Sequence, residues 1–332
     1  MKVRVVGYGA LGNQHFPLYN PDIADAITSQ GRYSIQSTNA HVIKTINDKY
    51  PFVNMVRSLS DTDSFHLSVK GLVDEYRKSA PDASKSQITE MVMKFESKVI
   101  APAINEMTKQ NFEWLNDKQL TMSMDAEGVG DTEVITGKKR YAIRLLSVDG
   151  HILAHPKYKI TGLEIKRSST PALMRKKLDE TLRLLFDGNN IECIKFMEDF
   201  EKEYLAGKYT LEEIAFPTGI SEMDKFEGGN ISIPIHVRAS MLHNKIIKEQ
   251  GMKDLSAICA GDKIKWVYLK QNKFGSDVIA FNDKDFLKRI KIADKVDLKL
   301  MFEKTYLSPL EKLIEAVGWK MNNQALIMDS LF

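Results

Sequence analysis

The pattern of apolar residues changes abruptly near residue 169, and no other feature constrains the fold as strongly. Between residues 119 and 166 the apolar residues follow the two-residue repeat of β-strands, which predicts strands at 120–124, 140–148 and 158–165. From Ser169-Thr170-Pro171, a typical helix start, the repeat becomes helical and continues until Gly188. A part that contains a sheet, followed by a mainly helical part, predicts an α+β fold with a domain boundary near residue 169.

The same periodicities predict further elements on both sides of that boundary. Helices are expected at 21–50 and 84–111, the second one kinked or divided by Pro102. Beyond the boundary, a helix is expected near 238–250 and another from Ser308-Pro309, with strands near 263–270 and 278–281.

Residues 53 to 69 carry a strand pattern that predicts a β-hairpin. Phe65, Leu67 and Val69 alternate with polar residues, a similar alternation begins at Val53 and Met55, and Ser60 to Asp63 form a polar turn. Asp61 and Asp63 are one residue apart, so both carboxylates would lie on one face of the strand. Two carboxylates this close repel each other, and a hard divalent cation such as Mg²⁺ explains them best. The alternative is an ordinary hydrogen-bonded turn.

The glycines near the N-terminus allow a different interpretation. Gly7 to Gly12 matches the GxGxxG pattern of a dinucleotide-binding oxidoreductase, which needs a helix that continues from the turn. Pro17 and Pro21 would interrupt such a helix, and no second strand ending in an acidic residue follows. We therefore reject a Rossmann domain. A phosphate-binding Walker A loop is also absent, because neither Ser nor Thr follows Gly137-Lys138.

Charge is distributed unevenly along the chain. The segment from Thr136 to Arg183 holds twelve basic and four acidic residues, a formal charge of +8 within a chain of +3, which leaves −5 elsewhere. Such a segment can attract a polyanion, although a solvated basic face is the simpler alternative. The two cysteines are isolated, which excludes a disulfide framework or a zinc knuckle. The sequence contains no run of 18 apolar residues, so no membrane span is predicted. We expect an intracellular protein without a membrane partner.

Asp61-Thr62-Asp63-Ser64 resembles motif C (DTDS) of the family B DNA polymerases, and other segments resemble motifs of that family in the family's order. Tyr8 to Asn13 (YGALGN) resembles the end of motif B, and Thr136 to Tyr141 matches the KKRY motif. The remaining matches are a palm-helix segment at 26–31, the palm-to-thumb junction at 162–171, and thumb segments at 234–244 and 303–310. The likeness covers nearly the whole chain and is greatest to the replicative polymerases of the T-even phage type.

The resemblance implies the C-terminal part of a right-hand polymerase, an antiparallel palm sheet with helices followed by a mainly helical thumb. It divides the chain into a remnant of the fingers at 1–13, a partial palm at 14–169 and a thumb at 170–332. One departure is Leu59-Ser60 before motif C, where the family usually has a glycine before the DTDS. Because serine is small, we expect the hairpin to form.

In this family, motif C supports two-metal nucleotidyl transfer, so the resemblance implies that Asp61 and Asp63 are catalytic and bind two Mg²⁺ ions. Tyr8, Gly9 and Thr62 would contact the incoming nucleotide. Asp125 and Glu127 match an acidic pair close to the palm site, although a solvated strand end would explain them equally well.

The resemblance also implies residues that bind primer-template DNA. These are Lys138, Lys139, Arg140, Tyr141, Lys166, Ser168, Ser169, Thr170, His236, Arg238 and Asn244. Lys139 and Tyr141 match readers of the minor groove, where the acceptors depend little on sequence. His236 could instead have a role in a folded core. The C-terminal tail would bind a sliding clamp through Ile327, Met328, Leu331 and Phe332, or else pack on the thumb.

The family's motif A, its fingers lysine and its exonuclease domain have no match in these 332 residues. We therefore expect the C-terminal subunit of a split DNA-directed DNA polymerase, which uses primer-template DNA and dNTP in complex with an N-terminal chain. Its place would be the cytoplasm of a phage-infected bacterium. The alternative is a non-catalytic duplex-binding module or an inactive polymerase relic, which would share the basic segment but not restore synthesis.

Overall fold

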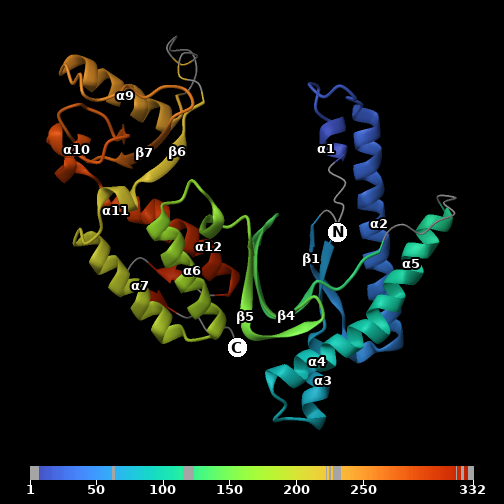
Figure 1. Cartoon of the computed structure of the whole chain (residues 1–332). Helices are drawn as coiled ribbons and strands as arrows, with labels where there is room; N and C mark the ends of the chain where they lie inside the picture. The colour runs from blue at the N-terminus through green and yellow to red at the C-terminus, as the bar shows by residue number, and fades with distance from the viewer. Residues whose placement is uncertain are drawn as a thin grey trace. The chain divides into compact units, whose positions relative to one another are not determined.

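The computed structural model describes residues 7–61, 64–114, 123–221, 223, 226, 233–318, 320–322 and 325–327. Its fold is a mixture of helices and small antiparallel sheets, so the predicted α+β class is confirmed (Figure 1). The chain forms two compact units: unit 1 contains Met1–Asp131 and Arg144–Tyr158, and unit 2 contains Thr132–Ile143 and Lys159–Phe332. The division into fingers remnant, palm and thumb remains a prediction.

Unit 1 is built from helices around one hairpin. Its helices are α1 (Gly7–Leu11), α2 (Pro21–Lys49), α3 (Lys70–Ser79), α4 (Lys85–Phe95) and α5 (Ala101–Trp114), and its hairpin strands are β1 (Val56–Asp61) and β2 (Ser64–Ser68). Helix α2 confirms the helix expected at 21–50. It begins with Pro21 at its first position, and the Asn20 side chain accepts a hydrogen bond from the Ile23 N–H.

The helix expected at 84–111 is continuous, because a π-helical turn joins α4 to α5. This turn, Glu96–Ile100, ends two residues before Pro102. A second π-helical turn, Glu303–Leu307, joins α11 (Leu298–Phe302) to α12 (Ser308–Ala316) and ends two residues before Pro309. Proline has no N–H for the helical ladder and its ring crowds the preceding turn, and a wider turn relieves both problems.

The core of unit 1 lies between α2, α5 and the hairpin. Val42, Ile46 and Met55 are buried there, and Phe65 and Leu67 of β2 pack against them. Val53 and Met55 are buried as their alternation suggested, but they are not strand residues. Pro51 starts a 3₁₀ turn at Pro51–Val53, and Asn54 follows with φ 45°, so the chain reverses before β1 begins.

A three-stranded sheet with the order β3–β4–β5 contributes residues to both units. Its strands are β3 (Gly128–Gly137), β4 (Arg140–Val148) and β5 (His151–Thr161). Strand β4 has the predicted bounds, whereas β3 was not expected. Of the strand expected at 120–124, residues 120–122 lie outside the described residues and 123–124 are not in a strand. Strand β5 ends at Thr161, and Gly162 follows with φ 66°, so the chain turns before the predicted end at 165.

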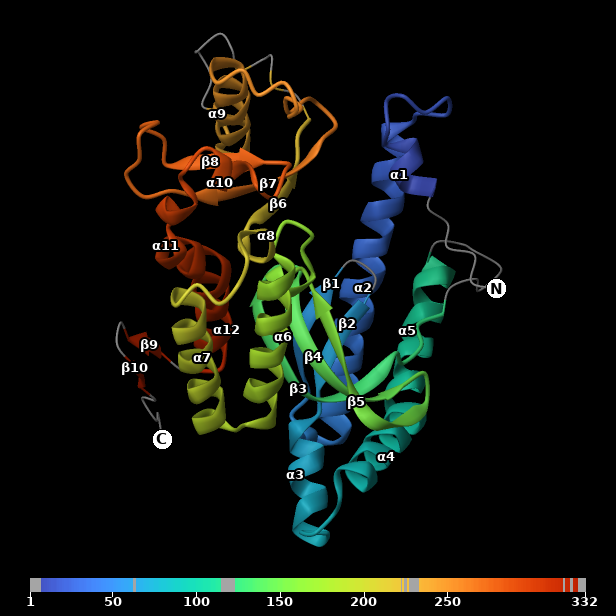
Figure 2. The same cartoon turned by 60° about the vertical axis from the view of Figure 1, so that its left-hand side comes forward.

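Unit 2 contains a helical layer and a second sheet. The helices are α6 (Ala172–Asp187), α7 (Asn190–Leu205), α8 (Leu211–Ile214), α9 (Ile235–Glu249), α10 (Phe286–Arg289), α11 and α12. Strands β6 (Phe216–Gly219), β7 (Lys263–Tyr268) and β8 (Val278–Phe281) form an antiparallel sheet against which α9 packs (Figure 2). Gly188 ends α6 with φ 72°, as predicted. The N-cap residue of α6 is Pro171. The expectation that Ser or Thr would be the N-cap, with Pro171 as the first helical residue, is therefore wrong.

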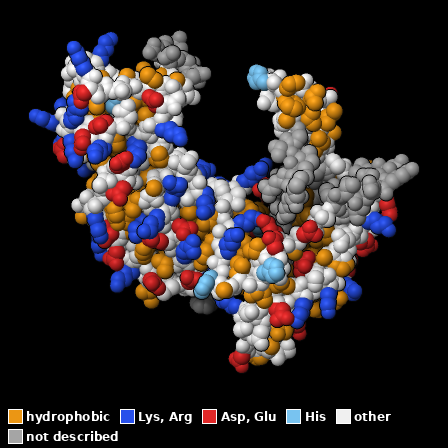
Figure 3. All heavy atoms as spheres, viewed as in Figure 1, with side chains coloured by type: hydrophobic (Ala, Val, Ile, Leu, Met, Phe, Trp, Pro, Cys, Tyr) orange, Lys and Arg blue, Asp and Glu red, His pale blue; other side chains and the backbone are white. Residues whose placement is uncertain are grey.

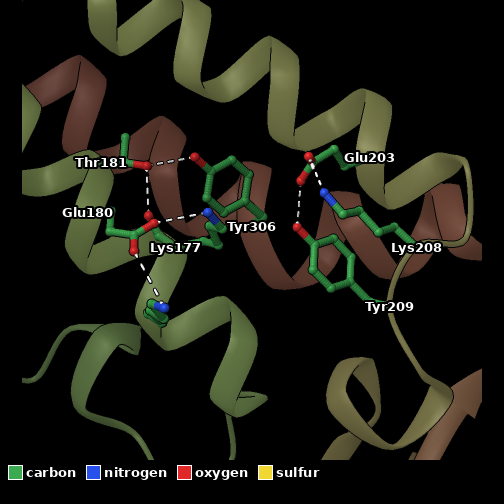
Figure 4. Close-up of polar contacts among 8 residues, drawn as sticks. Lys177, Glu180, Thr181, Glu203, Lys208, Tyr209 and Tyr306 are labelled. Atoms are coloured by element: carbon green, nitrogen blue, oxygen red, sulfur yellow. Dashed lines mark hydrogen bonds and ion pairs between the residues drawn. The ribbon is translucent and has the colours of Figure 1, made fainter.

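Aromatic side chains hold the helices of unit 2 together. The ring of Phe200 lies 4.9 Å from that of Tyr306 and 5.4 Å from that of Phe302. The Tyr306 hydroxyl is buried and lies 2.6 Å from the Thr181 hydroxyl, while Lys177 pairs with Glu180 one turn away (Figure 4). Burial raises the pKa of Tyr306. These contacts tie α6, α7 and the second π-helical turn into one layer.

Among the described residues, no helix combines the length and the apolar character needed to cross a membrane.

Candidate active site and nucleic-acid interface

The predicted hairpin forms, and Asp61 is the last residue of its first strand. Asp61 lies opposite Ser64, whose hydroxyl donates to the Asp61 carbonyl at 3.3 Å. The pairing of β1 with β2 shifts register between Arg57 and Leu59, near the start of β1. Thr62 and Asp63, which complete the motif, lie outside the described residues. The structure therefore places one of the two expected carboxylates, at the end of the hairpin.

The base of this hairpin is fixed to α2 by one side-chain amide. Asn47 Nδ2 donates to the Met55 carbonyl at 2.9 Å, and the Met55 N–H donates to Asn47 Oδ1 at 2.7 Å. This double hydrogen bond closes the chain reversal between α2 and β1, so it sets where β1 starts. Asn47 was not predicted from the sequence, where it is a polar residue that directly follows the buried Ile46.

The described residues contain no group of three or more His, Cys, Asp or Glu side chains that could hold a metal ion. Asp125 and Glu127 lie in the exposed segment before β3. Burial, and then the neighbouring charge of Asp125, raise the pKa of Glu96 in the first π-helical turn. Asp125 therefore lies close to a second carboxylate, but these residues do not form a metal site by themselves. Their role near the palm site stays a prediction.

The nucleotide-binding prediction falls mainly on residues that the structure does not describe. Gly9 lies in α1, where a Cβ atom would meet nothing within 4 Å. The side chain of Tyr8 and all of Thr62 lie outside the part of the chain that the structure describes. These contacts stay predictions.

Lys138 and Lys139 form the two-residue turn between β3 and β4, and both are exposed. Lys139 has φ 58°, a left-handed conformation. Gly162 packs directly behind this turn, since a Cβ atom at Gly162 would lie 2.0 Å from the Lys139 carbonyl oxygen. Arg140 forms an ion pair with Glu164, and Tyr141 is only 4% exposed. Of the four residues of the KKRY motif, the two lysines are therefore those that point to solvent.

The junction segment 166–170 lines a cleft within unit 2. Lys166, Ser168 and Ser169 are exposed, whereas Thr170 is only 7% exposed. The cleft has a volume of about 210 Å³ and is lined by Glu164, Arg167, Ser169, Thr170, Phe216, Thr218, Trp266, Lys304, Thr305 and Pro309. The lining combines the cations of Arg167 and Lys304 with the Glu164 carboxylate. Within it, the Thr218 hydroxyl accepts a hydrogen bond from Trp266 Nε1 and the Thr305 hydroxyl donates one to the Met301 carbonyl. Thr218 and Lys304 were not predicted from the sequence because they come from segments far from the junction, and Arg167 was passed over within the junction itself.

The three expected DNA contacts on α9 differ in what their side chains do. Arg238 is exposed and lies 3.0 Å from Asp277 Oδ2. Both amide atoms of Asn244 bind the Ile258 backbone, at 2.8 and 2.7 Å. Burial lowers the pKa of the half-buried His236. Arg238 is thus the one of these three with an exposed charge, and all three roles stay predictions.

The expected clamp-binding tail lies almost entirely outside the description. Ile327 belongs to β10 (Ala325–Ile327), which pairs with β9 (Lys320–Asn322). Nothing is described for Met328, Leu331 and Phe332, so the interaction with a clamp stays a prediction.

The sequence model of DNA polymerase family B matches residues 5–317. The chain belongs to this family. It is 29% identical over 97% of its length to a DNA-directed DNA polymerase of Escherichia phage RB69, and 27% identical over 98% to that of Enterobacteria phage T4. It is also 21% identical over 77% of its length to a DNA polymerase alpha catalytic subunit of Leishmania donovani. The family resemblance inferred from the motifs is confirmed.

The chain spans only 37% of the length of the two phage polymerases. The family match includes the hairpin, the basic turn, the cleft and α9, which all lie within the matched residues. The activity, the substrates and the partners of a whole polymerase are proposals for this chain.

Proposed function

We propose that these residues form the C-terminal part of a family B DNA-directed DNA polymerase, with most of the palm and the thumb. The observation that carries this proposal is the hairpin whose first strand ends at Asp61, in a chain that matches the family over residues 5–317. The names of both phage relatives support DNA-directed DNA synthesis as the activity. The substrates would be primer-template DNA and dNTP.

Asp61 and Asp63 would supply the motif C carboxylates for two Mg²⁺ ions. When bound, such a metal pair activates the primer hydroxyl and neutralises the charge of the triphosphate. Two carboxylates from one motif are too few ligands for two ions, and the described residues add no further cluster. The missing carboxylate would come from motif A, on an N-terminal polymerase segment. In the split arrangement, that segment is a separate chain with the fingers and the exonuclease.

An exposed apolar surface on unit 1 supports a partner of this kind. Tyr19, Ile23 and Ile27 follow one another at four-residue intervals across the start of α2, and all three are exposed. Trp114 on α5 is 69% exposed and its ring lies 5.3 Å from that of Tyr33. Figure 3 shows hydrophobic side chains gathered at the end of α2 that carries this surface. Exposed apolar patches of this kind mark interaction sites. The C-terminal tail would add a second partner, the sliding clamp.

Primer extension by the chain mixed with an N-terminal segment that carries motif A tests the proposal. We expect no extension by either part alone and extension by the mixture. Asp63→Ala should abolish extension because it removes a metal ligand. The control is Asp74→Ala on α3, which removes an exposed carboxylate that pairs only with Lys70 in the described structure. Extension that survives Asp63→Ala would refute the metal role.

A non-catalytic duplex-binding module is the second candidate. It is favoured by the basic turn at Lys138 and Lys139, which needs no metal and is formed within this chain. Both candidates predict duplex binding that weakens steeply with salt. They differ in the mixture, because a binding module would not restore synthesis.

A further inference from the structure

The basic turn is held in place by backbone contact with the junction that follows β5. Gly162 has φ 66°, and any side chain there would collide with the Lys139 carbonyl, because the added Cβ would lie only 2.0 Å from that oxygen. Lys139 is itself in the left-handed region, with φ 58°. The backbone of one segment therefore lies directly on the backbone of the other, and the position of the turn depends on residues more than twenty positions later.

An ion pair strengthens this contact, and it joins the residue after Lys139 to the second residue after Gly162. Arg140 and Glu164 bind each other, and their side chains are 24% and 23% exposed. The Arg140 Nε is buried and makes no hydrogen bond within the described structure. Arg167 lies 3.7 Å from the same Glu164 carboxylate. The Arg140 guanidinium is thus directed towards Glu164, while the two lysines beside it face solvent.

The charge of Glu164 makes its role testable by the sign of one effect. It is one of only four acidic residues in the +8 segment from Thr136 to Arg183. If its charge alone mattered, Glu164 would repel DNA phosphates, and its removal would tighten duplex binding. If Glu164 positions the turn, its removal should weaken duplex binding instead.

We propose that Glu164, with Gly162, is a positioning residue that holds Lys138 and Lys139 where they contact duplex DNA. Arg140 is its partner in this role and does not contact DNA. This inference rests on the proposed function, in which the turn binds the duplex. Its substrate class is the sugar-phosphate backbone and minor groove of the primer-template.

Duplex binding by the full chain, measured across a salt series, tests the proposal. Glu164→Gln keeps the shape of the side chain and removes its charge, and we expect affinity to fall by about threefold or more. The matched control is Asp149→Asn, which removes an exposed acid of the same segment, and asparagine tolerates its φ of 48°. The control should leave binding unchanged or slightly tighter.

Arg140→Gln separates the two roles of the arginine. As a partner of Glu164, it should lower affinity by the same factor as Glu164→Gln, and the double variant should lose no more than either single one. Its salt slope should match that of the unchanged chain. A slope reduced by about one unit would mean that Arg140 contacts a phosphate, which would overturn its assignment.

Hydrogen exchange of residues 136–142 reads the position of the turn without DNA. Glu164→Gln should speed exchange there while the thermal midpoint of the chain stays the same, and Asp149→Asn should not. If the variant Lys138→Gln/Lys139→Gln binds duplex normally, the proposed function fails at this turn and the inference fails with it. If those lysines matter but Glu164→Gln tightens binding or leaves exchange unchanged, the inference alone is overturned.

Discussion

The hairpin of β1 and β2 is held at its base, whereas the turn between β3 and β4 is held at its tip. In the first, Asn47 binds the backbone of Met55 before the strand begins, and Phe65 and Leu67 pack into the core. In the second, Gly162 and Glu164 contact Lys139 and Arg140 directly at the turn. Each element carries residues that the proposed function needs, carboxylates on one and lysines on the other.

The difference follows from what each tip has to meet. Under the proposed function, a carboxylate tip would need space for a metal ion and a triphosphate, and support from the base would suit that need. Two flexible lysines gain more from a fixed backbone, because phosphate binding is weakened by every side chain that must be ordered first. A functional loop can therefore be positioned in two ways, by contacts at its base or by contacts at its tip.

Gly162→Ala should produce the largest effect, because it tests the support at the tip. The alanine must adopt a left-handed conformation and displace the Lys139 backbone, and together these should cost about 3 kcal/mol of stability in unit 2. Gly188→Ala is the matched control, since Gly188 has φ 72° but a Cβ there meets nothing within 4 Å. Chemical denaturation of both variants measures the difference. Equal losses would mean that the contact with Lys139 carries no weight.

Asn47→Ala tests the support at the base and should have the next largest effect. It leaves the Met55 N–H and carbonyl without partners next to the core, at a cost of about 2 kcal/mol. Hydrogen exchange should rise across residues 56–68. Asn244→Ala removes the equivalent double hydrogen bond to Ile258 from unit 2, so it should destabilise unit 2 and leave exchange in 56–68 unchanged. A rise in that segment with Asn244→Ala would show that the two supports are not independent.

The smallest expected effect is an opposite response of the two units to acid. Burial lowers the pKa of His243, whose Nδ1 lies 3.1 Å from the Ala280 carbonyl, so stability of unit 2 is complete above pH 6.5 and is lost as pH falls through the folded pKa. Burial and Asp125 raise the pKa of Glu96, so its contribution to unit 1 is present below pH 4.5 and is lost as pH rises through the folded pKa.

Acidification from pH 7.5 to pH 5 should therefore weaken unit 2 while it strengthens unit 1. Hydrogen exchange followed unit by unit measures both changes. His243→Gln should remove the first change and Glu96→Gln the second, and each should leave the other unit as it was. A parallel response of both units would contradict the stated causes.

Local patterns predicted most elements, and they failed where a distant segment determined the outcome. The helix α2, the end of α6, the hairpin and β4 follow directly from periodicity and from Pro21, Gly188 and the polar turn. Val53 and Met55 kept their predicted burial but not their strand conformation, because Asn47 and Asn54 turn the chain there. Strand β3 was missed because its apolar alternation is weak, and its partner β4 stabilises it.

The same division applies to the candidate site. Motif C and the KKRY motif were readable as ordered residue types, and the family match confirms the resemblance that they carry. What each motif residue does was not readable. Tyr141 and Arg140 belong to one motif with Lys138 and Lys139, yet only the lysines face solvent. Asn244 belongs to a segment that matches a thumb motif, yet its amide is used by Ile258.

The sequence by itself determined the family, the α+β class, the acidic hairpin and the basic segment, because these depend on residue type and short-range spacing. Only the tertiary structure decided which of those residues support others and which are exposed. The reason is physical: a polar side chain binds whichever group lies within about 3 Å. For Glu164 and Arg140 that group belongs to a segment 24 residues away, brought close by the fold.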